Sequence, residues 1–275
     1  MKYIYSFILA VLLLFPIISS AQNFALNFTP TQYISSSPPG PVMLLTNNFT
    51  IECWVRWDGT NSAVDKYIFF NGNTSIRGYS LYIKANTQSI QMLYGGVIDL
   101  ATGVTLPANT PTHLALVRNA GITTLYVNGT AAPNTTTASP NVPIGTDGFS
   151  IGYFGSSVSF PGQIDNFRMW GAPLSAATIN AWMGLSVITT HPDIASLIAN
   201  YPMNEGSGQT TVSVGGSNPV SLTLGSTPTT DANDPTWVQS TFPVPTVTEW
   251  GLLLMGVLLM ALAWWKFPVT RHQQA

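Results

Sequence analysis

Apolar and polar residues alternate in short runs through the middle of the chain, between residues 24 and 238. The clearest run is residues 49–57, in which every second residue is apolar: Phe49, Ile51, Cys53, Val55 and Trp57. Successive side chains of a β-strand point to opposite faces, so a period of two places these five residues on one face. The run therefore predicts a strand that faces a hydrophobic core.

Turn residues between similar runs predict hairpins. Two pairs of runs are separated in this way: residues 79–83 and 89–93 around Asn86, and residues 113–117 and 122–127 around Asn119-Ala120-Gly121. Asn and Gly tolerate the positive φ angles of tight turns, and Asn128-Gly129 predicts a further turn. Four more strands are predicted at residues 149–154, 163–170, 199–203 and 220–224.

One segment has the pattern of a helix instead. Ser175 can cap a helix N-terminus, and Ile179 and Trp182 then lie on the same face, which predicts a short helix over residues 175–183. Residues 191–199 predict a second one. Many short strands with turn signals, and no regular alternation of strands with helices, predict an all-β antiparallel sandwich of the jelly-roll kind with one or two short helices.

Composition restricts the ligands that such a domain can bind. Only 7% of the residues are charged, against roughly 25% in a typical soluble domain, and the net charge is −2. This gives no basic surface for DNA or RNA, so we expect no nucleic-acid partner. Thr, Asn, Ser, Gly and Gln must supply the polar surface, which suits neutral ligands. Cys53 is the single cysteine, so no disulfide forms within the chain, and we expect a buried thiol.

The N-terminus has the layout of a secretory signal peptide. Lys2 precedes an uncharged apolar stretch over residues 3–18, and Ser19 and Ala21 then provide the small residues that signal peptidase requires. We predict cleavage between Ala21 and Gln22, so residues 1–21 are a signal peptide and the protein is exported. A retained transmembrane anchor is the alternative interpretation of the same stretch.

A second uncharged apolar run lies near the C-terminus, over residues 250–265. As a helix it is about 24 Å long, and extension to residue 267 brings it closer to the ~30 Å hydrocarbon core of a membrane. Lys266 and Arg271 follow the run and Glu249 precedes it, which predicts a transmembrane helix over residues 250–267 with a cytoplasmic C-terminus. A buried core helix is disfavoured, because almost no chain remains to cover it.

A short motif stands directly before this run. It consists of Val244, Pro245, Thr246, Val247, Trp250 and Gly251. The segment resembles the IPTLxxWG-type (IPTL-CTERM) sorting signals of Gram-negative bacteria, in which a motif, a transmembrane helix and a basic tail follow one another. This resemblance implies recognition, and possible cutting of the tail, by a membrane processing enzyme. The predicted organisation is a signal peptide (1–21), a sandwich domain (22–240), and a linker with sorting motif (244–251), helix and tail (241–275).

Several segments of the sandwich region have the character of family motifs: Ala25-Leu26-Asn27-Phe28, Phe49-Thr50-Ile51-Glu52-Cys53-Trp54-Val55, Thr112-His113-Leu114-Ala115-Leu116, Leu125-Tyr126-Val127-Asn128-Gly129, Gly162-Gln163-Ile164-Asp165-Asn166-Phe167-Arg168-Met169-Trp170 and Tyr201-Pro202-Met203-Asn204-Glu205-Gly206. In sequence and in order they resemble the motifs of the laminin-G-like jelly-roll domains of the concanavalin A-like lectin/glucanase superfamily, including their pentraxin-related branch. The resemblance implies a two-sheet sandwich with a binding function.

The residues that catalysis or a metal would need are dispersed. Glucanases of this fold carry an E-x-D-x-x-E set on one strand, whereas Glu52 and Asp165 each stand alone. We therefore expect no enzymatic activity and no cofactor. Calcium is possible but not favoured, with Asp165 and Glu205 as the remaining candidate ligands. Both have structural alternatives: Asp165 can anchor a strand end, and Glu52 or Glu205 can neutralise Arg168. Asp231 and Asp234 suit turns.

Three functions follow from these observations. The first is a carbohydrate-binding or adhesion module, for which aromatic rings near strand ends are candidates: Trp57, Tyr94, Tyr153, Phe154 and Phe160. Packing in the core is the alternative role for each ring. The second function is a structural or protein–protein interaction module at the cell surface, and the third is a glycan-active enzyme. The expected partners are thus a glycan or a surface protein, the membrane, and a processing enzyme.

Overall fold

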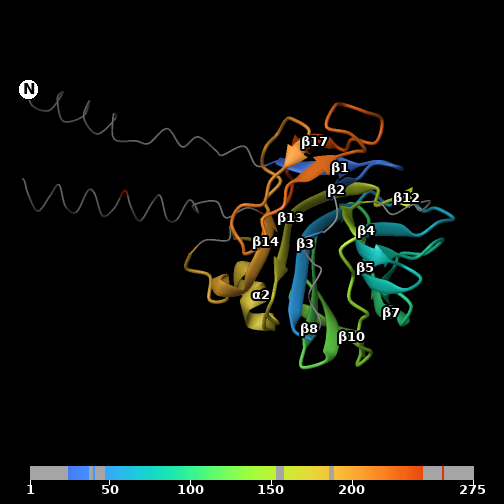
Figure 1. The fold of residues 1–275 in the computed structure, drawn as a ribbon, viewed down its shortest axis with the longest axis vertical. Helices are drawn as coiled ribbons and strands as arrows, with labels where there is room; N and C mark the ends of the chain where they lie inside the picture. The colour runs from blue at the N-terminus through green and yellow to red at the C-terminus, as the bar shows by residue number, and fades with distance from the viewer. Residues whose placement is uncertain are drawn as a thin grey trace, which may run out of the picture. The chain divides into compact units, whose positions relative to one another are not determined.

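A computed structural model describes residues 24–36, 40, 47–152, 158–185, 189–243 and 256. The chain divides into two compact units, Met1–Phe242 and Pro243–Ala275. The described strands all belong to the first unit, where they form two sheets packed face to face (Figure 1). Nearly every strand pair is antiparallel, which confirms the predicted all-β sandwich.

One of the two sheets, here called sheet A, contains β3, β8 and β13. Its strand order is β10-β9-β8-β3-β13-β1-β17, and β14 also pairs with β13. The strands are β10 (Thr130–Thr136), β9 (Ile122–Val127), β8 (Thr112–Asn119), β3 (Phe49–Trp57), β13 (Gly162–Trp170), β1 (Phe24–Phe28), β17 (Thr236–Gln239) and β14 (Leu197–Tyr201).

The opposing sheet, sheet B, has the order β15-β16-β2-β11-β4-β5-β6-β7. A short strand, β12, adds to β4 in parallel. The strands are β15 (Thr210–Thr211), β16 (Leu222–Leu224), β2 (Ile34–Ser36), β11 (Gly148–Ile151), β4 (Lys66–Asn73), β5 (Arg77–Ile83), β6 (Ser89–Tyr94), β7 (Ile98–Thr105) and β12 (Val158–Ser159).

The main hydrophobic core lies between the two sheets. The five alternating apolar residues of β3 all face it, and each of these residues is at most 2% exposed to solvent. Cys53 is among them and is a free thiol, as expected, and its burial raises its pKa. Both predicted hairpins are present as β5–β6 and β8–β9, with positive φ angles at Asn86 in the first turn and at Ala120 and Gly121 in the second. Asn128 and Gly129 have positive φ angles in the further predicted turn, between β9 and β10.

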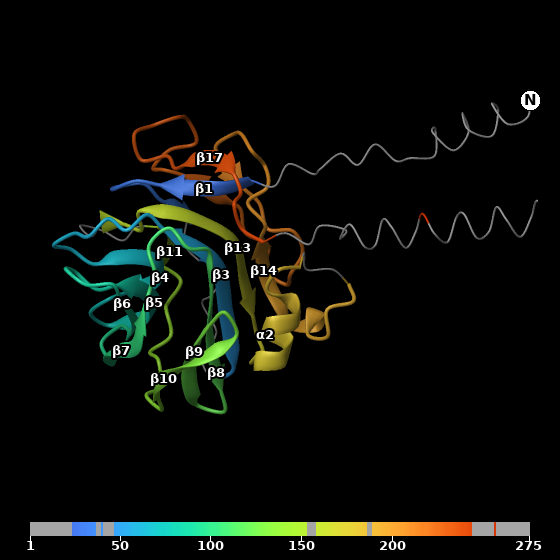
Figure 2. The same ribbon diagram turned by 180° about the vertical axis from the view of Figure 1, so that it is seen from behind.

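One short helix, α2 (Ala176–Trp182), covers part of the outer face of sheet A (Figure 2). Ser175 is its N-cap, and its side chain accepts a hydrogen bond from the backbone N–H of Thr178 at 3.0 Å, as predicted. Ile179 packs into a second apolar cluster on that face with Val117 and Leu174.

The predicted second helix is wrong. Residues 194–196 form only one 3₁₀ turn, η1 (Ile194–Ser196), and β14 begins at Leu197. Ala199 and Tyr201 are buried in the main core, whereas Leu197 is buried in the outer cluster with Trp170, because the register of β14 on β13 shifts between Met169 and Trp170. Pairing with β13 therefore decides the conformation of this segment.

The C-terminal predictions fall on residues that the structure does not describe, Gly256 excepted. In the described part of the chain, no helix combines the length and the apolar character needed to cross a membrane. The signal peptide and the sorting motif lie outside the described residues, as does the predicted transmembrane helix apart from Gly256.

Candidate functional site

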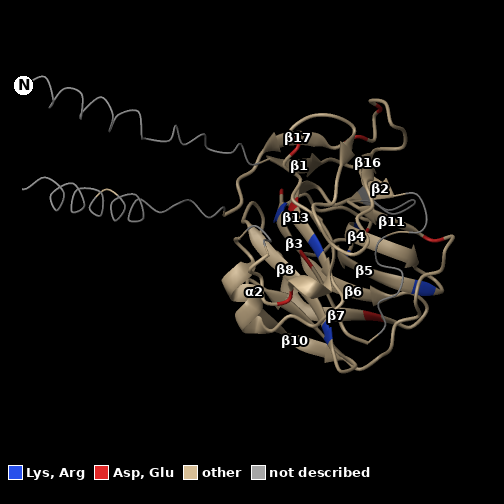
Figure 3. Cartoon of the chain, turned by 60° about the vertical axis from the view of Figure 1, so that its left-hand side comes forward, with Lys and Arg blue, Asp and Glu red and all other residues tan. Residues whose placement is uncertain are grey.

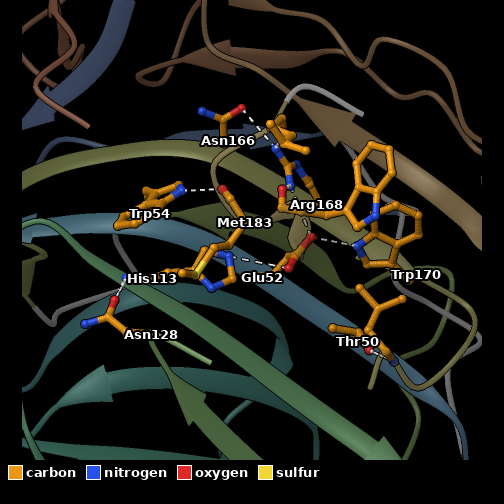
Figure 4. A network of polar contacts seen from close by, with 12 residues as sticks. Thr50, Glu52, Trp54, His113, Asn128, Asn166, Arg168, Trp170 and Met183 are labelled. Carbon is orange, nitrogen blue, oxygen red and sulfur yellow. Dashed lines mark hydrogen bonds and ion pairs between the residues drawn. The ribbon is translucent and has the colours of Figure 1, made fainter. Parts of the chain in front are cut away.

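Charged and aromatic side chains are buried together on the outer face of sheet A (Figure 4). Glu52 of β3 is at the centre, and Arg168 Nη1 lies 3.4 Å from its Oε1. Trp170 Nε1 donates a hydrogen bond to the same oxygen at 3.1 Å, and His113 Nε2 lies 3.4 Å from Oε2. β3 has β8 on one side and β13 on the other, so side chains from three adjacent strands meet here.

This buried network holds the end of α2 against the sheet. Arg168 donates hydrogen bonds to the backbone carbonyls of Trp182, at 3.2 Å, and Leu185, at 2.5 Å. Trp54 Nε1 donates to the carbonyl of Met183 at 2.6 Å. The last carbonyls of a helix have no partners within the helix, so the two side chains satisfy them. The role of the network is therefore to anchor the helix.

Glu52 is charged in this enclosed place. Burial by itself would raise the pKa of its carboxyl, but the hydrogen bond to His113 and the charge of Arg168 outweigh it and lower the pKa to about 2. Of the two acidic residues considered as partners for Arg168, Glu52 makes the contact. Glu205 instead accepts hydrogen bonds from Thr211 Oγ1 and the N–H of Val212, at 3.0 and 2.9 Å.

The two candidate calcium ligands are used within the fold. Asp165 is completely buried, and it accepts hydrogen bonds from the Asn166 N–H at 2.7 Å and from Ser240 Oγ at 2.9 Å. These contacts hold Ser240, next to the last strand, against β13. Over the described ranges, no three His, Cys, Asp or Glu side chains gather in a way that could hold a metal ion.

The burial of Asp165 leads to a pH-dependent prediction. Burial raises the pKa of this carboxyl from 3.8 to about 7, although the hydrogen bonds from Ser240 and Asn166 oppose the rise. The stability that Asp165 contributes is therefore complete below pH 3.8 and is lost as the pH rises through 7. We expect Asp165→Asn to have a Tm similar to the wild type at pH 4 and at least about 2–4 °C higher at pH 8. Thermal unfolding followed by circular dichroism at both pH values tests this, and a lower Tm of the variant at pH 8 would contradict it.

The aromatic candidates that the structure describes lie in the core. Trp57, Tyr94 and Phe160 are completely buried, and none presents a ring face to solvent. Tyr94 also forms a buried hydrogen bond with Thr123 at 2.6 Å. Packing, the alternative considered for each, accounts for all three rings. Tyr153 and Phe154 lie outside the described residues.

The loop before β17 has the turn chemistry expected from its sequence. Asp231 Oδ2 accepts hydrogen bonds from the backbone N–H groups of Ser226 and Thr227, both at 3.1 Å. Asp234 Oδ2 accepts one from the N–H of Asp231 at 2.9 Å. The two carboxylates thus shape the loop.

A cleft of about 400 Å³ opens on the outer face of sheet A, beside the start of α2. The β8–β9 hairpin forms one side and residues 173–176 form the other. The lining residues are Val117, Asn119, Ile122, Thr124, Tyr126, Pro173, Leu174, Ser175 and Ala176. The volume is within the usual range of small-molecule sites, roughly 300–1,000 Å³.

The chemistry of the cleft is neutral and amphipathic. Its lining includes the Tyr126 ring, aliphatic side chains and Pro173, but no charged residue. Among the described residues, the side chains of Asn119, Thr124 and Tyr126 form no hydrogen bond with one another or with any neighbour. An amide and two hydroxyls therefore remain available beside a half-exposed aromatic ring. Charged side chains are sparse over the whole described sandwich (Figure 3).

A second aromatic group lies on the outer face of sheet B. Tyr67 and Tyr82 stack with ring centroids 4.9 Å apart, and Tyr82 Oη donates to the Asp99 carboxylate at 2.7 Å. Lys84 Nζ lies 3.6 Å from Asp65 and 3.8 Å from Asp99. The polar groups of this surface bind one another, whereas the side chains of Asn119, Thr124 and Tyr126 in the cleft bind no described neighbour, so the cleft is the better candidate for ligand binding.

The sequence patterns do not single out the cleft residues. They place Asn119 in a turn and Thr124 and Tyr126 in a strand. One signal was present: both strand residues occupy the outward-facing positions of β9, while Leu125 faces the core. An aromatic residue at an outward position indicates either a covering element or a binding surface, but the sequence does not show where α2 lies.

Two family models match parts of this chain. The family model of the concanavalin A-like lectin/glucanases superfamily matches residues 28–180, and the IPTL-CTERM motif model matches residues 242–273. No curated protein matches the chain.

Solved structures are similar to this chain at low sequence identity. A candidate carbohydrate-binding protein from Bacteroides ovatus is 20% identical with a TM-score of 0.56, over 81% of this chain and 61% of that one. The chain thus spans less than two thirds of that protein. Domain 4 of an extracellular arabinanase from Geobacillus stearothermophilus, in complex with arabinotriose, is 20% identical with a TM-score of 0.43, over 57% of this chain and 71% of the domain. The CBM40 module of a Ruminococcus gnavus sialidase is 18% identical with a TM-score of 0.45, over 57% and 95%.

The family match covers more than half of the chain and agrees with the observed pair of antiparallel sheets. The protein belongs to the concanavalin A-like lectin/glucanases superfamily and carries an IPTL-CTERM motif.

Proposed function

We propose that this protein is an exported, envelope-held binding module whose sandwich recognises a neutral carbohydrate in the cleft beside β9. The observation that carries the proposal is the cleft itself, where the half-exposed Tyr126 is combined with the Asn119 amide and the Thr124 hydroxyl, which form no hydrogen bond with the described residues. Sugars present an apolar face of C–H groups and a rim of hydroxyls, so aromatic rings and neutral hydrogen-bonding groups are suitable partners for them.

The lining also favours one class of sugar over another. An acidic sugar such as a sialic acid would need an arginine or lysine to pair with its carboxylate. The cleft lining contains neither residue. Its volume of about 400 Å³ suits one or two sugar units rather than a long chain held along a groove. The ligand class is therefore an uncharged mono- or disaccharide unit, free or at the end of a glycan.

Binding without catalysis is the second part of the proposal. Glycoside hydrolysis needs two carboxyl groups on either side of the bond that breaks. Glu52 is enclosed under α2 beside Arg168, and both oxygens of Asp165 already accept hydrogen bonds. These acidic residues of sheet A are used to hold the fold.

The place of action is the third part. Residues 1–21 have the pattern of a signal peptide, and the IPTL-CTERM match at residues 242–273 includes the uncharged run at 250–265. We propose that export is followed by retention in the envelope through this run, with a membrane processing enzyme acting at the motif. The carbohydrate would then be met outside the cytoplasm.

The test of carbohydrate binding is an array of neutral and sialylated glycans probed with the full-length protein. We expect binding to uncharged glycans, and we expect Tyr126→Ala to weaken it at least about tenfold, equivalent to 1.4 kcal/mol, since the sugar loses its stacking surface. Asn119→Ala should also weaken binding, and because this side chain is exposed, the fold should not be affected.

Ile76→Ala is the matched control, since Ile76 is 54% exposed in the β4–β5 turn of the other sheet. It should bind like the wild type. Failure of the wild type to bind any glycan, together with capture of a specific envelope or matrix protein, would favour the protein-interaction function instead. Equal binding by wild type and Tyr126→Ala would place the ligand elsewhere on the sandwich.

A further inference from the structure

The wall of the cleft opposite the hairpin is held by one buried hydroxyl. Thr50 of β3 is completely buried, on the same outer face of sheet A as Glu52 (Figure 4). Its Oγ1 donates a hydrogen bond to the carbonyl of Ala172 at 2.9 Å and accepts one from the N–H of Leu174 at 2.8 Å. A single side chain thus satisfies a donor and an acceptor on either side of Pro173.

Pro173 makes this pair of contacts important. Proline has no N–H, so the segment between Ala172 and Leu174 has few backbone groups that could hold it by other means. Leu174 packs against Val117 in the apolar cluster below the cleft, but apolar contacts alone do not fix the direction of a backbone. The hydroxyl of Thr50 therefore sets where Pro173 and Leu174 lie relative to the hairpin.

The N–H of Gly171, just before the segment, donates to the carbonyl of Ser196 at 2.7 Å, and the remaining anchors act further along the chain. Arg168 and Trp54 bind carbonyls at and beyond the end of α2, and Asn180 Nδ2 donates to the Gly129 carbonyl at 3.4 Å. None of these contacts reaches the residues that line the cleft. Thr50 is distinct because its two partners flank a lining residue directly.

From this geometry we infer that Thr50 is a positioning residue for sugar recognition: it touches no ligand, but it fixes the wall formed by Pro173 and Leu174 at the distance at which a sugar contacts both this wall and Tyr126. The inference rests on the proposed carbohydrate-binding function. It assigns an effect on ligand affinity to a residue that is buried beneath the cleft and does not line it. Small displacements of a binding wall weaken a ligand's contacts even when every contacting residue is retained.

The test compares two substitutions of similar size. Thr50→Val keeps the shape but loses the donor and the acceptor, whereas Thr50→Ser keeps both. We expect Thr50→Val to weaken binding of uncharged oligosaccharides (arabinotriose, cellotriose and maltotriose, and the best neutral glycan of the array) at least about tenfold by calorimetry, and Thr50→Ser to restore binding to within about threefold of the wild type. The Leu174 amide should exchange its hydrogen faster in Thr50→Val than in Thr50→Ser.

Thr102→Val separates positioning from a general loss of stability. Thr102 on β7 is 1% exposed, and its hydroxyl donates to the Ile90 carbonyl at 2.8 Å, away from the cleft. Its valine variant should lose a comparable amount in Tm but bind like the wild type. If Tyr126→Ala weakens binding as expected but Thr50→Val has the affinity of the wild type, the inference about Thr50 is overturned and the proposed function is not. Absence of binding by the wild type would overturn the proposed function and the inference together.

Discussion

Replacing Glu52 by alanine is expected to destabilise the protein by about 3–5 kcal/mol, the cost of leaving one member of a buried ion pair without its partner. Arg168 is 2% exposed and would keep its charge without the carboxylate 3.4 Å away. Trp170 Nε1 would lose its acceptor as well. Denaturant unfolding of the variant and the wild type at pH 7 measures the difference.

A double variant distinguishes the ion pair from simple loss of packing. Glu52→Ala with Arg168→Met removes both charges and leaves an apolar side chain of similar length. It should be more stable than Glu52→Ala alone, because replacing a buried pair by apolar residues is often neutral, whereas breaking it is not. Arg168→Met also removes the hydrogen bonds to the Trp182 and Leu185 carbonyls, so the single variant Arg168→Met is measured as well. If the losses of the two single variants simply add up in the double variant, the unpaired charge of Arg168 is not what destabilises Glu52→Ala.

The same carboxylate gives a pH dependence of defined direction. Its pKa is lowered to about 2 in the folded protein from 4.5. The stability that it contributes is present above pH 4.5 and is lost as the pH falls toward 2, and a shift of this size corresponds to roughly 3 kcal/mol. The stability difference between wild type and Glu52→Gln should therefore shrink between pH 5 and pH 2. A difference that stays constant over this interval would contradict the low pKa.

Gly162→Ala is expected to destabilise the protein by more than about 3 kcal/mol, because the site has no room for a side chain and has a backbone conformation that other residues rarely adopt. Gly162 begins β13 with a φ of +135°. A Cβ atom there would lie 2.1 Å from the carbonyl oxygen of Arg56 and 3.1 Å from the backbone nitrogen of Asp58. Both obstacles are backbone atoms of the adjacent chain segment, so relief would require β3 and β13 to separate.

Gly148→Ala is the matched control for this substitution. Gly148 begins β11 on the other sheet, and a Cβ there would meet no atom within 4 Å. Its stability should stay within about 0.5 kcal/mol of the wild type. Thermal and denaturant unfolding of the two variants test the prediction together. A similar loss in both would mean that the contact with the Arg56 carbonyl does not decide the effect, because the reduced flexibility of the unfolded chain favours the folded state of both variants.

Local patterns predicted much of the sandwich. The alternation in β3 identified all five of its core residues, and the turn residues identified the β5–β6 and β8–β9 hairpins. Where the alternation is broken, the prediction failed. The register of β4 shifts between Tyr67 and Phe69, so its apolar residues do not alternate and the strand was not predicted. β10 was missed for a related reason, since Pro133 interrupts it.

What the sequence by itself determined is therefore the fold class, the family, the neutral surface and the short helix with its Ser175 cap. These properties depend on residues close together in the chain, whose periodicity and turn preferences act locally. Only the tertiary structure decided which outward-facing residues are covered and which are free. Tyr126 and Trp170 both point away from the core, yet one lines a cleft and the other is buried beside Glu52. The difference arises because α2 and its anchors bury Trp170 but leave Tyr126 half-exposed, and that placement depends on contacts between residues more than 100 positions apart.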